Sequence, residues 1–224
     1  LTIHTGAEIS GVDLNQPISD SDATDIWDAF LKWKVVFFRD QPMSHADQVT
    51  FGRRFGELTI GHAVFGHVDG YPEIYSIAKD RWDNRYKPAP KNIRPWTGFH
   101  ADITAAVNPP AVSILRGVTI PPYGGDTLWA NLVVAYDSLS EPIRNFVDGL
   151  RGLHKFQPPG EIDVTEEYKA MQERRRLTTE HPMVRVHPET GERVLYISPS
   201  FLKSVVGMEP RESELILEML WEHS

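Results

Sequence analysis

Residues 98–110 read GFHADITAAVNPP, and this stretch decides the fold expected for the chain. It is β-prone and ends at an Asn-Pro-Pro turn signal, so it predicts a strand. On a strand, residues two apart point to the same face, so His100 and Asp102 would lie close together. One imidazole and one carboxylate, joined by a second histidine, make the facial ligand set of non-heme iron(II). The alternative is a structural pair, in which the two side chains only hydrogen-bond to each other.

The same His-x-Asp spacing occurs twice earlier, at His45 with Asp47 and at His67 with Asp69. The first pair lies in the opening turn of a predicted helix that begins after Ser44, where residues two apart point about 200° away from each other. That pair cannot share a metal, so we expect Asp47 to cap the helix and His45 to be solvated. The second pair precedes a glycine, so Asp69 is expected to be a turn residue.

A chain of 224 residues is long enough for one domain with a sizeable core. Hydrophobic residues make up 41% and charged residues 24%, as in an ordinary soluble globular protein. The net charge of −8 argues against nucleic acid as a partner. No apolar run reaches ~18 residues, so no membrane span is expected. The absence of cysteine excludes disulfides and thiolate metal sites and makes the cytoplasm the default compartment.

Periodicity and turn signals predict an α+β fold, with a β-sandwich or jelly-roll core and flanking helices. Helices are expected where a capping residue precedes apolar residues three and four apart, and a hairpin where two β-rich runs flank a Pro-Glu-Thr-Gly turn. The expected helices are 19–34, 44–56, 139–150 and 209–224; the expected strands are a pair within 2–14, a fully buried run at 35–39, a short run at 73–78 and a hairpin at 183–198.

The segment 99–154, which begins FHADITAAVNPPAVSILRG and contains PPYGGDTLWANL, resembles the taurine dioxygenase and alkylsulfatase family of iron(II)- and 2-oxoglutarate-dependent dioxygenases. The runs KVVFFRDQ, FGRRFGEL and HPMVRVHPETGERVLYIS are similar to that family too. The likeness extends from about Ile9 to Trp221. It implies a double-stranded β-helix, or jelly-roll, in one domain over residues 1–224, a homo-oligomer, and iron(II) and 2-oxoglutarate as cofactors, with molecular oxygen consumed.

Residue by residue, the resemblance implies that His100 and Asp102 are the first two iron ligands. Thr127, in the run GGDTLW, matches the threonine that contacts the 2-oxoglutarate carboxylate. A hydroxyl can donate a hydrogen bond to an anion, and the two preceding glycines suit a tight turn. Taken without the resemblance, that run is only a loop.

The resemblance also implies a substrate site. His62 matches a histidine that contacts a sulfonate, and Phe65, Trp96 and Ile103 fall among residues that line the substrate. Phe65 stands where the taurine enzyme has a tyrosine, Trp96 lies near the place of an asparagine, and Phe99 replaces the tryptophan before the first ligand. The loss of polar contacts favours a bulkier or more apolar sulfonate or sulfate ester over taurine.

One family motif is missing, namely Trp-Asp-Asn-Arg-x-x-x-His, which supplies the third ligand and is followed by an arginine that pairs with 2-oxoglutarate. Residues 82–85 read WDNR, but they come too early and no histidine follows at the right spacing. We therefore expect the domain to be incomplete at its C-terminus and to continue beyond Ser224, with its last strands and both missing residues there.

The implied reaction is hydroxylation of the carbon next to the sulfur of an organosulfonate, or next to the sulfate oxygen of an alkyl sulfate. The product breaks down to an aldehyde and sulfite or sulfate, while 2-oxoglutarate becomes succinate and carbon dioxide. Two alternatives stay open: a non-catalytic jelly-roll binding module, and a zinc-dependent hydrolase that uses the same pair with a water.

Overall fold

The computed structural model describes residues 3–61, 67–77, 94–156 and 177–224. The chain divides into two compact units, Leu1–Ala78 with Ile114–Trp129 and Lys79–Ser113 with Ala130–Ser224. The elements are β1 (Ala7–Glu8), α1 (Asp20–Trp33), β2 (Val36–Phe37), α2 (His45–Gly52), α4 (Leu132–Asp137), α5 (Glu141–Val147), β3 (Arg151–Lys155), β4 (Thr178–Pro182), β5 (Val184–Val186), β6 (Arg193–Leu195), β7 (Leu202–Val205) and α7 (Pro210–His223). Within the described ranges, no helix has the length and apolar character needed to cross a membrane.

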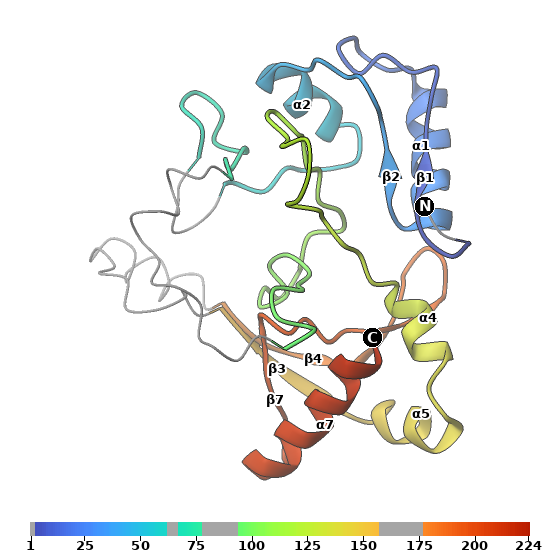
Figure 1. Cartoon of the computed structure of the whole chain (residues 1–224), viewed down its shortest axis with the longest axis vertical. Coiled ribbons are helices and arrows are strands. Elements are labelled where there is room, and N and C mark those ends of the chain that lie inside the picture. The colour runs from blue at the N-terminus through green and yellow to red at the C-terminus, as the bar shows by residue number, and fades with distance from the viewer. Residues whose placement is uncertain (1–2, 62–66, 78–93, 157–176) are drawn as a thin grey trace. The chain divides into compact units, whose positions relative to one another are not determined.

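In the first unit, α1 lies alongside the parallel pair of β1 and β2 (Figure 1). Ser19 caps α1: its hydroxyl accepts from the backbone N–H of Asp22, whose side chain binds back to Ser19. Ser44 and Asp47 form the same reciprocal cap on α2. These caps satisfy backbone donors that a helix start leaves unpaired, and they confirm both predicted helix starts. The core of this unit is built on Leu14, Ile26 and Phe51.

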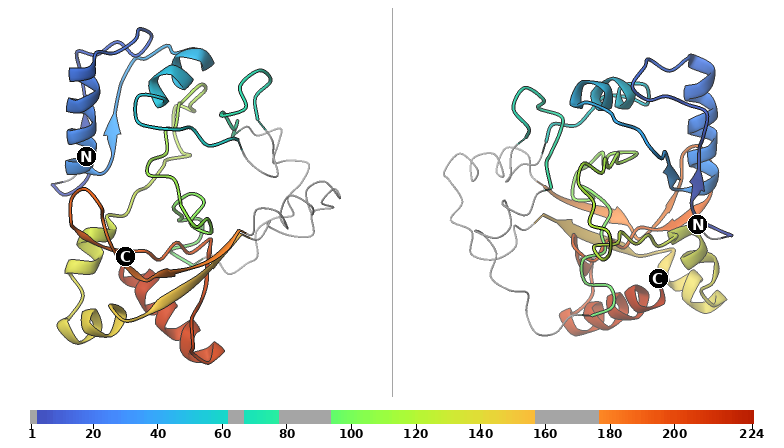
Figure 2. Two further views of the ribbon diagram at one scale, coloured as in Figure 1. Left: turned by 180° about the vertical axis from the view of Figure 1, so that it is seen from behind. Right: turned by 45° about the horizontal axis from the view of Figure 1, so that its top comes forward.

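The second unit contains a three-stranded antiparallel sheet in the order β4-β3-β7 and the separate β5–β6 hairpin. The helix α7 packs against β7 beside this sheet (Figures 1 and 2). Apolar residues of the sheet, the hairpin and α4, α5 and α7 share one core: Ala135, Tyr136, Leu139, Val147, Met183, Val184, Leu195, Ile197, Leu202, Val205, Leu217 and Leu220. The predicted hairpin is confirmed, as are the predicted helices that hold α5 and α7.

Several strand predictions are wrong. Residues 3–14 hold one strand, β1, which pairs with β2 instead of with a neighbour in that segment. β2 has two half-buried residues, where a fully buried run was expected. Residues 73–77 form no strand, although Val68 and Tyr71 make an isolated bridge across the predicted turn at Asp69. Strands need a hydrogen-bonded partner, which local composition does not supply.

Candidate metal and active site

His100 and Asp102 lie at a turn, not on the predicted strand. Residues 102–105 are turn residues, and Ile103 between the ligand candidate and Thr104 has a left-handed φ of 50°. The turn nevertheless brings the pair together, because His100 Nε2 lies 3.4 Å from Asp102 Oδ1. Both side chains are about half exposed, at 51% and 50%. His100 and Asp102 are therefore close together as predicted, but a backbone turn brings them together and not a strand.

The imidazole of His100 is held in one tautomer. Its Nδ1 lies 2.8 Å from the carbonyl oxygen of Gly98, and because a carbonyl can only accept, Nδ1 carries the proton. In the protonated ring Nε2 also carries a proton, which faces Asp102 Oδ1, and loss of that proton leaves a lone pair on Nε2. The hydrogen bond to Asp102 raises the pKa of His100 above its ordinary value, and partial burial opposes that rise. The ring is thus oriented as a metal-binding histidine would be.

The carboxylate of Asp102 is oriented by Ser113. The Ser113 hydroxyl donates to Asp102 Oδ2 at 2.5 Å, while Oδ1 is the oxygen nearest to His100. A carboxylate with one oxygen held by a hydroxyl is fixed in rotation, as ligating carboxylates usually are. No signal in the sequence distinguishes Ser113 from any other polar residue eleven positions after Asp102.

The pair belongs to the second unit, and the chain on both sides of it is hydrogen-bonded to other residues of that unit. Before the turn, the backbone N–H of Ala101 donates to Ser198 Oγ at 3.2 Å, and Ser200 Oγ donates to the carbonyl of Phe99 at 3.3 Å. After Asp102, three successive residues bond to side chains of β3 and β4: Thr104 to His154, Ala105 to Thr179 and Ala106 to His181. The turn is therefore a supported element and not a loose loop.

An imidazole nitrogen beside a carboxylate oxygen suits iron, zinc or manganese and fits two positions of a facial ligand set. In the part of the chain that the structure describes, no cluster of three or more His, Cys, Asp or Glu side chains is placed to hold a metal ion. Among the described residues, His100 and Asp102 thus offer two donor atoms of the kinds that such a metal accepts.

The other predicted site residues are distributed as follows. Trp96 is half-buried in the same unit, with its ring 6.3 Å from that of Trp221 on α7. Ile103 is half-buried and directly follows Asp102. Thr127 belongs to the first unit, is exposed, and follows two glycines that both have positive φ, as a tight turn requires. His62 and Phe65 lie outside the described residues, as does the WDNR run at 82–85.

His45 is not simply solvated, which corrects the prediction for the first His-x-Asp pair. It is half-buried, its Nδ1 lies 2.8 Å from Arg116 Nη2, and its ring is 5.2 Å from that of Tyr71. Since a guanidinium only donates, Nδ1 of His45 accepts. The pair is a structural contact of the first unit, and Asp47 is occupied by the cap of α2.

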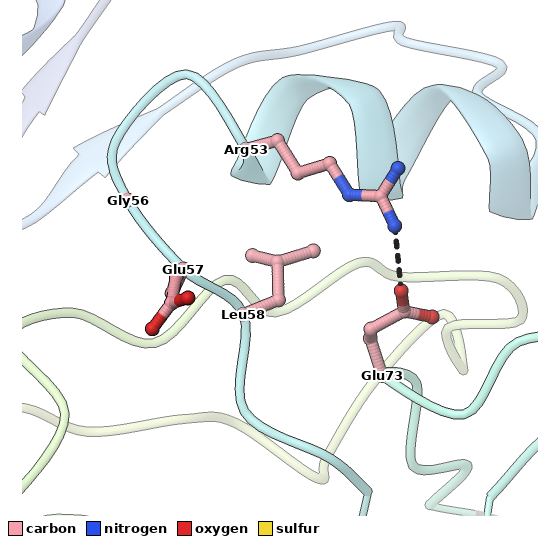
Figure 3. Close-up of a pocket in the computed structure, with 5 residues that line it drawn as sticks. All are labelled: Arg53, Gly56, Glu57, Leu58 and Glu73. Atoms are coloured by element: carbon pink, nitrogen blue, oxygen red, sulfur yellow. Dashed lines mark hydrogen bonds and ion pairs between the residues drawn. The ribbon is translucent and has the colours of Figure 1, made fainter.

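An open pocket of the first unit contains none of the predicted site residues (Figure 3). Arg53 reaches across it to Glu73, with Arg53 Nη2 2.8 Å from Glu73 Oε1. Gly56, Glu57 and Leu58 complete its lining. Its one cation is already paired, so the pocket offers no evident anion site and the chemistry of the chain points to His100 and Asp102 instead.

Comparison with known proteins shows the family of the chain. The family model described as "Taurine catabolism dioxygenase TauD, TfdA family" matches residues 1–224. An alkylsulfatase from Acinetobacter baylyi is 35% identical over 99% of this chain and 68% of its own length. An alpha-ketoglutarate-dependent sulfate ester dioxygenase from Pseudomonas putida is 32% identical over 97% of this chain and 71% of its own. An alpha-ketoglutarate-dependent sulfonate dioxygenase from Saccharomyces cerevisiae is 30% identical over 99% of this chain.

Among solved structures, a taurine dioxygenase from Burkholderia xenovorans is 57% identical with a TM-score of 0.83, over 100% of this chain and 70% of that one. The chain spans 53% of the yeast relative and 68% of the Acinetobacter relative. The family match and these relatives therefore define a 2-oxoglutarate-dependent dioxygenase, a class that uses iron(II). The chain belongs to the TauD, TfdA family of dioxygenases.

Proposed function

We propose that the protein hydroxylates the carbon next to the sulfur of an organosulfonate, or next to the sulfate oxygen of an alkyl sulfate. The products would be an aldehyde with sulfite or sulfate, together with succinate and carbon dioxide. The observation that carries the proposal is the 3.4 Å approach of His100 Nε2 and Asp102 Oδ1 on a supported, half-exposed turn. The sulfonate and sulfate ester dioxygenases among the relatives support this choice of substrate class.

In this proposal, His100 and Asp102 hold iron(II), which when bound supplies the activation of oxygen that side chains cannot perform. Gly98 keeps the proton on Nδ1 of His100, so the ligating nitrogen is available without a change of tautomer. Ser113 fixes the Asp102 carboxylate. As the family resemblance implies, Thr127 would donate to 2-oxoglutarate and His62 would bind the substrate anion. Phe65, Trp96 and Ile103 would contact the apolar part of the substrate.

We also propose that the third ligand and the 2-oxoglutarate arginine belong to a part of the protein outside residues 1–224, where further strands complete a jelly-roll. Two observations support this. The chain spans 70% of the Burkholderia taurine dioxygenase structure. Apolar side chains of the segment 114–129 stand open to solvent, among them Val118 at 78% and Leu128 at 70% exposure, and exposed apolar side chains favour a covering partner. A homo-oligomer in the cytoplasm completes the proposal.

The test is succinate formation by the full-length protein, with and without iron(II), across a panel of alkyl sulfates and organosulfonates of increasing length. We expect succinate only when iron(II), 2-oxoglutarate and oxygen are all present. His100→Ala and Asp102→Ala should each lower the turnover by at least about 100-fold without loss of the fold, because removing a ligand removes the metal. His67→Ala, from the exposed pair with the same spacing, is the matched control and should keep activity.

Each alternative has its own result. Hydrolysis of a sulfate ester without oxygen or 2-oxoglutarate would identify a zinc-type hydrolase and contradict the proposal. Absence of succinate with every substrate, despite bound iron, would indicate a binding module.

A further inference from the structure

Three aromatic rings are packed beneath the turn that carries the ligand pair. His154 on β3 is 0% exposed and His181 on β4 is 6% exposed. Their ring centroids are 5.4 Å apart, and the ring of Tyr196 lies 5.2 Å from His154 and 5.3 Å from His181. The proposed reaction uses neither histidine. The burial of two neighbouring imidazoles indicates a structural or functional role, because polar groups are costly to remove from water.

Their hydrogen bonds point at the turn. His154 Nδ1 lies 3.0 Å from the hydroxyl of Thr104, two residues after Asp102. His181 Nε2 lies 2.9 Å from the carbonyl of Ala106 and must donate to it, because a carbonyl only accepts. Between them, Thr179 Oγ1 donates to the carbonyl of Ala105 at 2.9 Å. Three successive residues of the turn are thus each bonded to a side chain of the sheet.

Strand register explains how the sheet presents these side chains. His154 pairs with Thr179 and Gly152 pairs with His181 across β3 and β4. Paired residues share a face of the sheet, and so do residues two apart on one strand. His154, Thr179 and His181 therefore project from one face. A side chain at Gly152 would fill the space beside them, since its Cβ would lie 2.4 Å from Leu202 Cδ1 and 3.6 Å from His154 Nε2.

The bond from His154 is a bond between neutral groups. Burial, followed by electrostatic interaction with His181 and Arg185, lowers the pKa of His154 to about 4. The ring is therefore neutral near pH 7 and offers one protonated and one unprotonated nitrogen. Its Nε2 is buried without a hydrogen-bond partner among the described residues, so Thr104 provides the hydrogen bond that orients the ring.

We propose that His154 and His181 are positioning residues, which hold the turn at 104–106 so that His100 and Asp102 keep their spacing and thereby set the affinity of the pair for a divalent metal. The inference rests on the proposed function, in that it takes His100 and Asp102 as ligands. Neither histidine touches the metal or the substrate. Their effect passes through Thr104 and Ala106 to the backbone of the turn.

The test is anaerobic titration of the full-length protein with cobalt(II), followed by its visible absorption. His154→Leu and Thr104→Val each remove one partner of the same bond at similar volume. Each should weaken cobalt binding about tenfold, which is the usual effect of a residue that supports a ligand. The double variant should also bind cobalt about tenfold more weakly than wild type, and not about a hundredfold, because both substitutions remove the same hydrogen bond. His154→Asn, whose amide can replace Nδ1, should stay within about threefold of wild type.

A matched control separates positioning from general destabilisation. Val147→Ala opens the buried core of the same unit without touching the turn, so it should lower the melting temperature and leave cobalt affinity within about twofold. Unchanged cobalt affinity in His154→Leu and Thr104→Val, or strictly additive losses in the double variant, would overturn the inference.

A second measurement keeps the inference separate from the proposed function. Hydrogen exchange of the metal-free protein reports on the amides of Ala101 and Ala106, which bond to Ser198 Oγ and to the carbonyl of Ile103. Faster exchange at both amides in His154→Leu, but not in Val147→Ala, supports the positioning role. Equal exchange overturns it. If cobalt binding by wild type is insensitive to His100→Ala, the proposed metal site is wrong, and the exchange result still decides whether the histidines hold the turn.

Discussion

One carboxylate oxygen of Asp102 accepts a hydrogen bond from Ser113, and the other lies next to His100. Ser113→Ala would leave that carboxylate free to rotate, so we expect metal affinity to fall about tenfold. Because Ser113 is exposed, the free energy of unfolding should change by no more than about 0.5 kcal/mol. Ser113→Thr keeps the hydroxyl and should behave like wild type. Metal titration and thermal melting of the three proteins give the answer, and equal affinities would show that Asp102 needs no such partner.

The depressed pKa of His154 links folding to pH. In the unfolded chain the ring takes up a proton near pH 6.5, whereas in the folded protein it does so near pH 4. The unfolded state therefore binds more protons between these values, and stability falls as pH drops from about 6.5 to about 4. We expect about 1–2 kcal/mol of the acid-induced loss to disappear in His154→Leu, after allowance for solvent screening. Denaturant melts at several pH values measure this.

Val147→Ala is the control for that series. It removes buried apolar volume and no titrating group, so its stability curve should run parallel to that of wild type at every pH. A curve for His154→Leu that is also parallel to wild type would contradict the assignment of a neutral buried ring.

At the scale of elements, two glycines that flank the start of β3 predict opposite outcomes. A Cβ at Gly152 would lie 2.4 Å from Leu202 Cδ1, so Gly152→Ala should cost about 1–3 kcal/mol through overpacking. A Cβ at Gly149 meets nothing within 4 Å, and Gly149→Ala should be neutral or slightly stabilising because it restricts the unfolded chain. Chemical denaturation of both variants checks the pair, and equal effects would be inconsistent with the close approach of β3 and β7.

Of the helices that the structure describes, α1, α2, α5 and α7 were predicted from the sequence because their signals are local, while α4 was not predicted. Ser19 and Ser44 each stand three residues before an aspartate that closes a reciprocal cap, and the apolar spacing that follows belongs to the same element. Strands were predicted poorly because their signals are not local. β3, β4 and β7 find one another across gaps of the chain, while the β-prone run after His100 forms a turn.

The proximity of His100 and Asp102 was predicted correctly, although by an argument whose local structure was wrong, and their role as metal ligands stays a prediction. Spacing suggested a strand, and only the family resemblance gave His100 and Asp102 their roles. Neither spacing nor resemblance pointed to Ser113, nor to the positioning role of His154 and His181, because those contacts form between residues that are 11 to 75 positions apart. Such contacts are visible only once the chain is folded.

At the scale of the whole molecule, the open apolar segment 114–129 has a consequence for behaviour in solution. Val118, Ile120 and Tyr123 are 75–88% exposed and lie within six residues of one another, and apolar side chains exposed close together favour association. We expect the isolated 224-residue chain to bind an apolar fluorescent dye and to self-associate, and a longer protein with the proposed strands to do neither. Ile120→Ser should reduce dye binding by the shorter chain. Equal dye binding by both proteins would contradict the proposed covering of this segment.

The left-handed φ of 50° at Ile103 implies that the thermal stability and the activity of the protein make opposite demands on this position. A β-branched residue in that conformation costs about 1–3 kcal/mol, and glycine or asparagine would hold the same turn with less strain. Selection for heat resistance alone would therefore replace Ile103. The proposed enzyme would then lose an apolar side chain beside its metal, so laboratory evolution for thermal tolerance and for turnover should diverge at this position.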